Sequence, residues 1–214
     1  MSGHALRYDP ATVREAYAAA ALAFARLAGE VADEATLEQP GLGEWTVRDL
    51  LGHTSRALTT VTGYLAAGVD RPVALQHPLD YASVFAAAAA EPGSVADRGR
   101  ATGAELGLDV AAEIQRRVDD AVSAVSDHPD DAPVATPAGV MRLVDYLPSR
   151  IFELVVHSDD LARAAGAPLQ QHEAAVEIAL TYAAGLAAIR PDAEHHLRAL
   201  VGRDEGGARG SVVG

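Results

Sequence analysis

The chain has 214 residues, which suits one domain with a well-packed core, and we expect residues 1–214 to form a single domain. Its formal net charge is −13 and its arginines are scattered, so it should repel a nucleic-acid backbone; nucleic-acid binding is not expected. Hydrophobic residues make up 49% of the chain but aromatic residues only 5%. This composition favours closely packed helices over a β-sandwich and predicts an all-α fold.

The chain contains no cysteine, which excludes disulfides, thiolate metal ligands and a cysteine nucleophile. Any thiol chemistry must therefore use a small-molecule thiol. Residues 1–7 lack the apolar region of a signal peptide, and no run of about 20 apolar residues appears. We expect a cytoplasmic protein without a membrane segment.

The first predicted helix begins at Asp9, a good N-cap, with Pro10 in its first turn. Apolar residues then recur at alternating spacings of four and three as far as Val31, which predicts a helix with one buried stripe. The segment 39–43 contains one proline and two glycines and should end this helix in a loop.

The second predicted helix begins at Thr46, because Asp49 three residues later completes a sequence typical of a capping box. Its apolar stripe ends near Gly68. Residues 70–80 are rich in proline, aspartate and histidine and are predicted to be a loop, and a short helix is predicted over 81–90.

A third helical pattern covers 94–126, with interruptions at Gly99, Gly103 and Gly107. The segment 133–139 contains two prolines and a glycine, so we expect a loop there with at most a brief extended piece.

A fourth long helix is predicted over 143–165, and two further helices over 171–189 and 192–201. We therefore divide the chain into a bundle core over about 8–166, a helical extension over about 167–201 and a weakly structured tail over 202–214.

The fourth predicted helix carries a polar stripe next to an apolar one. Its polar side chains recur at spacings of four, three, four and three, which places them on one face: Tyr146, Arg150, Glu153, His157 and Asp160. The apolar face should pack in the core, with the polar stripe beside the buried seam. The second helix repeats this arrangement with Asp49, His53, Arg56 and Thr60.

Glu153 and His157 are separated by four residues, so their side chains can converge on one metal ion. A histidine from the second helix, His53, would complete a three-ligand site between the two helices. Nitrogen and oxygen ligands without thiolate suit a divalent metal, with zinc first and nickel, iron or manganese as alternatives. The same residues also fit a plainer interpretation, in which Glu153 and His157 form an exposed helix pair and His53 is simply hydrogen-bonded.

Three other residues on these faces are candidates for catalytic roles. Arg56 and Arg150 either form ion pairs with Asp49 or Asp160 or recognise a carboxylate. Asp160 either accepts a hydrogen bond from a ligating histidine or is an exposed acid. Trp45, just before the second helix, is expected to pack as a hydrophobic staple, with pocket lining as the alternative.

Two segments carry a resemblance to a known family. Residues 44–53 resemble the W-[ST]-x-x-D-L-x-x-H signature of the DinB-like proteins, in particular the mycothiol-dependent maleylpyruvate isomerase group. Residues 150–161 resemble that group's R-x-x-E-x-x-x-H-x-x-D-L. The resemblance extends over about 8–203. It implies His53, Glu153 and His157 as metal ligands, mycothiol as a co-substrate, and a four-helix bundle with a long crossover connection and short C-terminal helices.

The first functional hypothesis is a metal-dependent thiol transferase or isomerase, whose partners are a small-molecule thiol and a small electrophile; such a protein could form a homodimer. A second hypothesis is a non-catalytic binding or regulatory module that keeps the bundle, with or without the metal, for stability. The third is hydrolysis by a metal-bound water. The sequence does not choose among these three.

Overall fold

The computed structural model describes residues 7–84 and 92–203. Its helices and strands, in chain order, are α1 (Pro10–Val31), α2 (Glu34–Leu37), α3 (Val47–Ala66), the 3-10 helix η1 (Pro78–Tyr81), α5 (Pro92–Ala104), α6 (Val110–Asp127), β1 (Pro133–Thr136), β2 (Gly139–Arg142), α7 (Leu143–Ala165), α8 (Glu173–Ala188) and α9 (Ala193–Leu200). Within these described ranges, no helix is long and apolar enough to cross a membrane.

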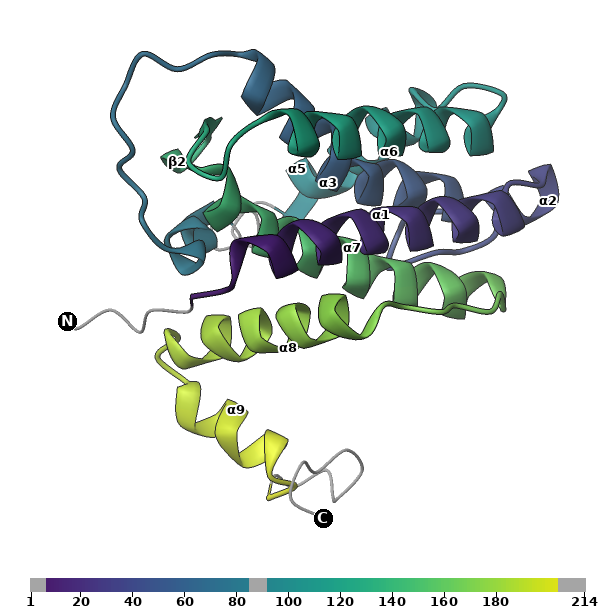
Figure 1. The fold of residues 1–214 in the computed structure, drawn as a ribbon. Helices are drawn as coiled ribbons and strands as arrows, with labels where there is room; N and C mark the ends of the chain where they lie inside the picture. The colour runs from purple at the N-terminus through teal and green to yellow at the C-terminus, as the bar shows by residue number, and fades with distance from the viewer. Residues whose placement is uncertain (1–6, 85–91, 204–214) are drawn as a thin grey trace.

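Four helices form the bundle, and each contacts two others, in the circular order α1, α6, α3 and α7. Figure 1 shows α6 and α7 on opposite sides of α1, with α8 covering the far side of α7 and α9 extending away from the bundle. The apolar stripes of the four helices meet in one continuous core. The predicted all-α four-helix bundle is therefore confirmed, and the long crossover is the connection from α3 to α6.

The structure has side-chain caps at the two helix starts that were predicted from capping residues. The Asp9 carboxylate accepts a hydrogen bond from the backbone N–H of Thr12 at 2.9 Å, and Pro10 is the first helical residue. At the start of α3, Thr46 and Asp49 each accept a hydrogen bond from the other's backbone N–H, at 3.2 and 3.1 Å. This capping box fixes where α3 begins and hence which residues face α7.

The interruptions predicted within 94–126 are only partly correct. The chain does break at Gly107, which has a φ of +68°, but Gly99 and Gly103 lie inside α5. A Cβ atom at Gly99 would lie 2.5 Å from the Trp45 ring, and one at Gly103 would lie 2.9 Å from the Asp49 carboxylate. These glycines let α5 approach α3 closely, so they are needed for packing rather than for breaking the helix.

The prediction of a loop over 133–139 is wrong in part, because β1 and β2 form an antiparallel hairpin around the turn at 137–138. The hairpin holds the crossover in place. The backbone N–H groups of Ala74 and Leu75 both donate to the carbonyl oxygen of Val140, at 2.9 and 3.0 Å. This contact fixes the crossover just before η1, which packs against α7.

Two smaller differences concern short helices. The single turn of α2 was not predicted, although Asp33 caps it by accepting a hydrogen bond from the Thr36 backbone N–H at 3.0 Å. Only the first residues of the helix predicted over 81–90 are described, and the rest of that prediction lies outside the described residues, as does the tail after residue 203. The helices predicted after residue 170 are present as α8 and α9.

Candidate metal centre

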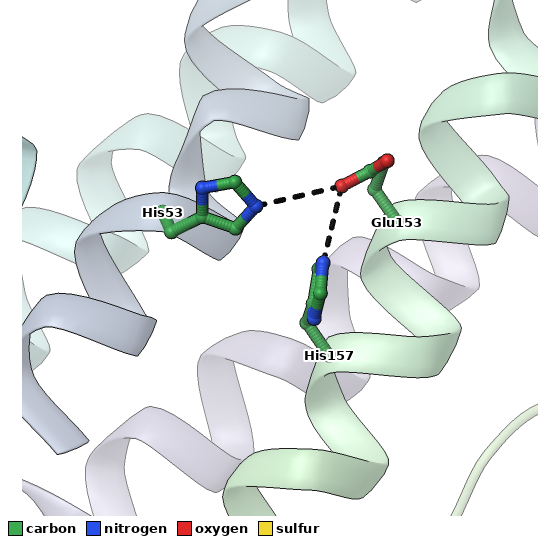
Figure 2. A group of neighbouring side chains, drawn as sticks. All are labelled: His53, Glu153 and His157. Atoms are coloured by element: carbon green, nitrogen blue, oxygen red, sulfur yellow. Dashed lines mark ion pairs between the residues drawn. The ribbon is translucent and has the colours of Figure 1, made fainter. Parts of the chain in front are cut away.

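Side chains from α3 and α7 converge in the seam between these helices. Figure 2 shows His53 on α3 pointing across to Glu153 and His157 on α7, with both imidazoles directed at one carboxylate oxygen. Glu153 Oε2 lies 3.7 Å from His53 Nε2 and 3.3 Å from His157 Nε2. One potential ligand atom from each residue lies within 4.8 Å of the other two, as a common ion requires.

These separations fit a small metal ion. Two ligands at 2.0–2.1 Å from a tetrahedral ion lie about 3.3 Å apart, so the three side chains need only small adjustments to share one. Each of the three side chains keeps 17% of its surface exposed, so the cluster is partly shielded but reachable. Among the described residues it is the one group of three or more histidine, cysteine or acidic side chains with this spacing.

Asp160 orients the second imidazole. Its carboxylate lies 3.0 Å from His157 Nδ1, which places the proton on Nδ1 and leaves Nε2 facing the cluster. Burial alone would lower the pKa of His157, but Asp160 and Glu153 together raise it to about 9. Burial alone would raise the pKa of Glu153, but the nearby imidazoles of His157 and His53 and the charge of Arg150 lower it well below its usual range.

His53 is held differently. Its ring stacks on Trp45 with the centroids 4.5 Å apart and the planes tilted by 33°. The indole N–H of Trp45 donates to the carbonyl oxygen of Ala96 at 3.0 Å, which ties the ring to α5. Within the described part of the chain, the buried His53 Nδ1 has no hydrogen-bond partner. The staple interpretation of Trp45 did not anticipate this contact, although a tryptophan eight residues before a candidate ligand was a usable signal.

The polar stripe of α7 is more buried than predicted. Tyr146 is fully buried and Arg150 is 7% exposed, because α3 and η1 cover this face. Neither of the predicted arginine ion pairs is formed among the described residues. Asp160 instead contacts His157, and Asp49 is used in the capping box of α3.

The guanidinium of Arg150 lies between two aromatic rings. Its central carbon is 5.2 Å from the Tyr81 ring centroid and 4.9 Å from that of Tyr146. The Tyr146 hydroxyl donates to Thr60 Oγ1 at 2.9 Å. Thr60, the last residue of the polar stripe predicted on α3, therefore has a hydrogen-bond partner on α7. Tyr81 belongs to the crossover, and its place beside Arg150 could not be inferred from helical periodicity.

Comparison with curated proteins gave no match, and comparison with solved structures gave none either. A family model described as the mycothiol maleylpyruvate isomerase N-terminal domain matches residues 17–162. The match covers more than half of the chain and includes His53, Glu153 and His157. On this evidence, the chain belongs to the mycothiol maleylpyruvate isomerase N-terminal domain family.

Proposed function

We propose that this protein binds a divalent metal through His53, Glu153 and His157 and uses it to activate a small-molecule thiol toward a small electrophile. The reaction would be thiol S-transfer or thiol-dependent isomerisation. The observation that carries the proposal is the convergence of two imidazole nitrogens on one carboxylate oxygen, at 3.7 and 3.3 Å, in a partly open seam.

Zinc is the metal that this donor set fits best, because neutral imidazole and carboxylate ligands in a tetrahedral arrangement are common zinc ligands. With three protein ligands, a bound zinc ion supplies an open coordination position at which the pKa of a thiol or water is lowered. The chain has no cysteine, so the thiol must come from solution. The family name points to mycothiol as that thiol.

The residues around the cluster would each contribute to such a reaction. Asp160 holds His157 in the tautomer whose Nε2 can bind a metal. Trp45 covers one face of His53 and limits the access of water from the α5 side. A partly dry site strengthens the electrostatic stabilisation of a thiolate beside the metal.

The test combines elemental analysis of the purified protein with thiol consumption assays. We expect about one metal ion per chain, and consumption of mycothiol in the presence of a bimane or an α,β-unsaturated acid that stops when the metal is removed. Full metal loading with no turnover for mycothiol or several other thiols would contradict the proposal and favour a binding module. Turnover without added thiol would instead indicate hydrolysis.

The same proposal includes an expectation about the compartment and one about the oligomeric state. We propose that the protein acts in the cytoplasm, because the reaction needs a supply of a reduced small-molecule thiol. We also propose a homodimer, which size-exclusion chromatography with light scattering would detect by its mass.

A further inference from the structure

The outer side of α8 is apolar although it faces away from the bundle. The inner side of this helix buries Ile178 and Tyr182 as α8 packs on α7 and α1. On the opposite side, Val176, Leu180 and Ala184 recur at intervals of four residues and are exposed, Leu180 by 59%. A helix that is apolar on both sides is normally buried on both sides, so the outer side of α8 has the character of an interface.

The outer side of α8 is complementary in size to a second copy of itself. Its large side chains, Val176 and Leu180, lie in the first half of the helix, whereas the second half carries Ala183, Ala184 and Ala187 on the same side. In an antiparallel pair with a two-fold axis at Leu180, Val176 of each copy faces Ala184 of the other. Large side chains then meet small ones, which lets the two helices approach closely.

The short helix α9 has an exposed apolar side as well. Ala193, Leu197 and Leu200 share this side, Leu197 is 60% exposed, and no residue of α9 is buried. A helix of eight residues is only marginally stable by itself and depends on the packing of its apolar side. Figure 1 shows α9 extending away from the bundle, starting from the C-terminal end of α8. Its apolar side therefore lacks a covering surface in the described part of the chain.

The charges of α8 and α9 complement each other between copies. Glu173 and Glu177 lie in the first half of α8, and neither forms an ion pair among the described residues. Arg198 donates to the carbonyl oxygen of Arg203 at 3.2 Å, which keeps two arginines together at the end of α9. Within one copy, the acidic end of α8 is about 22 Å from the end that leads into α9. In the antiparallel pair, the acidic end of one α8 lies instead beside the α9 of the other copy.

We propose that α8 forms the interface of a homodimer, in which two copies of this helix pack antiparallel about Leu180 and each α9 lies along the acidic end of the other copy's α8. The inference rests on the homodimer included in the proposed function and names its interface. A stable interface buries about 800 Å² on each partner, and a helix about 24 Å long supplies only part of this area, so α9 must contribute.

The first test uses the absence of cysteine from the chain. In Leu180→Cys, the new thiol would lie against its own copy at the two-fold axis, within the distance that a disulfide requires. We expect mild oxidation with diamide to link most of this variant into a covalent dimer. The control, Leu22→Cys, changes an exposed leucine on α1 and should link at least about 10-fold more slowly. Equal rates in the two variants would overturn the interface.

The second test measures the dissociation constant of the dimer by analytical ultracentrifugation. Leu180→Glu places two like charges against each other, and we expect the dissociation constant to rise at least about 100-fold. Glu177→Arg should raise it about 10-fold, and adding Arg198→Glu should reverse most of that loss. Leu22→Glu is the control and should leave it unchanged. Circular dichroism verifies that the variants are folded, which we expect because Leu180 is largely exposed.

The outcomes separate the interface from the rest of the proposed function. A dimer that is unchanged in Leu180→Glu would refute the interface on α8 and leave the homodimer standing. A wild type that is monomeric at every concentration would refute both and would indicate that α9 packs on the α8 of its own chain. Neither result bears on the metal or the thiol reaction, which elemental analysis and thiol consumption test separately.

Discussion

The two seams that α3 makes with its neighbours differ in how they treat a buried arginine. In the seam with α6, Arg117 pairs with Glu113 at 2.7 Å and also donates to Ser55 Oγ at 2.8 Å. In the seam with α7, Arg150 donates to Ser149 Oγ and lies between two aromatic rings, and its charge lowers the pKa of Glu153, which faces the two imidazoles. The first seam pairs its buried arginine with a carboxylate, whereas the second holds the three residues that we propose as metal ligands.

The largest expected effect comes from removing one of the three proposed ligands in the seam between α3 and α7. Changing His53, Glu153 or His157 to alanine leaves two protein ligands, and we expect metal affinity to fall by more than about 100-fold in each case. Competition with a chromophoric chelator measures the affinity. His195→Ala, an exposed histidine on α9, is the control and should retain the wild-type affinity. Equal metal retention in all four variants would mean that the metal binds elsewhere.

The next prediction compares the two seams directly through stability. Glu113→Gln removes the counter-ion of the buried Arg117, and we expect the free energy of unfolding to fall by about 2 kcal/mol. Arg150→Met replaces an unpaired charge by an apolar chain of similar length, so the free energy of unfolding should stay within about 1 kcal/mol of the wild type or rise. Urea unfolding followed by circular dichroism measures both. A larger loss in Arg150→Met than in Glu113→Gln would reverse the comparison.

A smaller effect is expected from the residue that orients His157. Asp160→Asn keeps the size of the side chain but weakens the contact with Nδ1, so metal affinity should fall about 10- to 100-fold. Asp159→Asn is a matched control, because Asp159 pairs with Arg163 on the surface and not with a candidate ligand. The same loss in both variants would show that net charge, rather than orientation of the imidazole, controls affinity.

The smallest expected effect is the pH dependence of the free energy of unfolding that Glu113 on α6 contributes. Hydrogen bonds from Arg116 and Arg117 outweigh burial and lower the pKa of Glu113 from 4.5 to about 2. A lowered folded-state pKa stabilises the fold above pH 4.5, and this contribution disappears as the pH falls toward 2. The difference in unfolding free energy between wild type and Glu113→Gln should therefore narrow over that range. A constant difference would mean that Glu113 does not titrate with a lowered pKa.

The sequence predicted the helices that have strong local signals. The caps at Asp9 and Thr46 and the regular apolar stripes located α1 and α3, and the i, i+4 pair on α7 indicated the cluster that the structure brings together. Whether these residues bind metal remains a prediction. Local signals are sufficient here because a helix fixes the direction of each side chain from its position in the sequence.

The features that sequence reasoning missed depend on contacts between distant segments. Gly99 reads as a helix breaker until Trp45 is seen against it, and the surroundings of Arg150 include Tyr81 from the crossover. Periodicity within one helix contains no information on which loop residue will cover it. The hairpin was missed because its two short strands are stabilised mainly by each other and by the crossover.

The bonds from Ala74 and Leu75 to Val140 divide the crossover into two stretches with different tolerance to change. Insertions before residue 74 lengthen a surface loop whose far end is already anchored. Insertions between Leu75 and Tyr81 would instead move the Tyr81 ring away from Arg150. Relatives could therefore reposition Tyr81 by editing the five residues between Leu75 and Tyr81, while the four bundle helices and the proposed metal ligands stay unchanged.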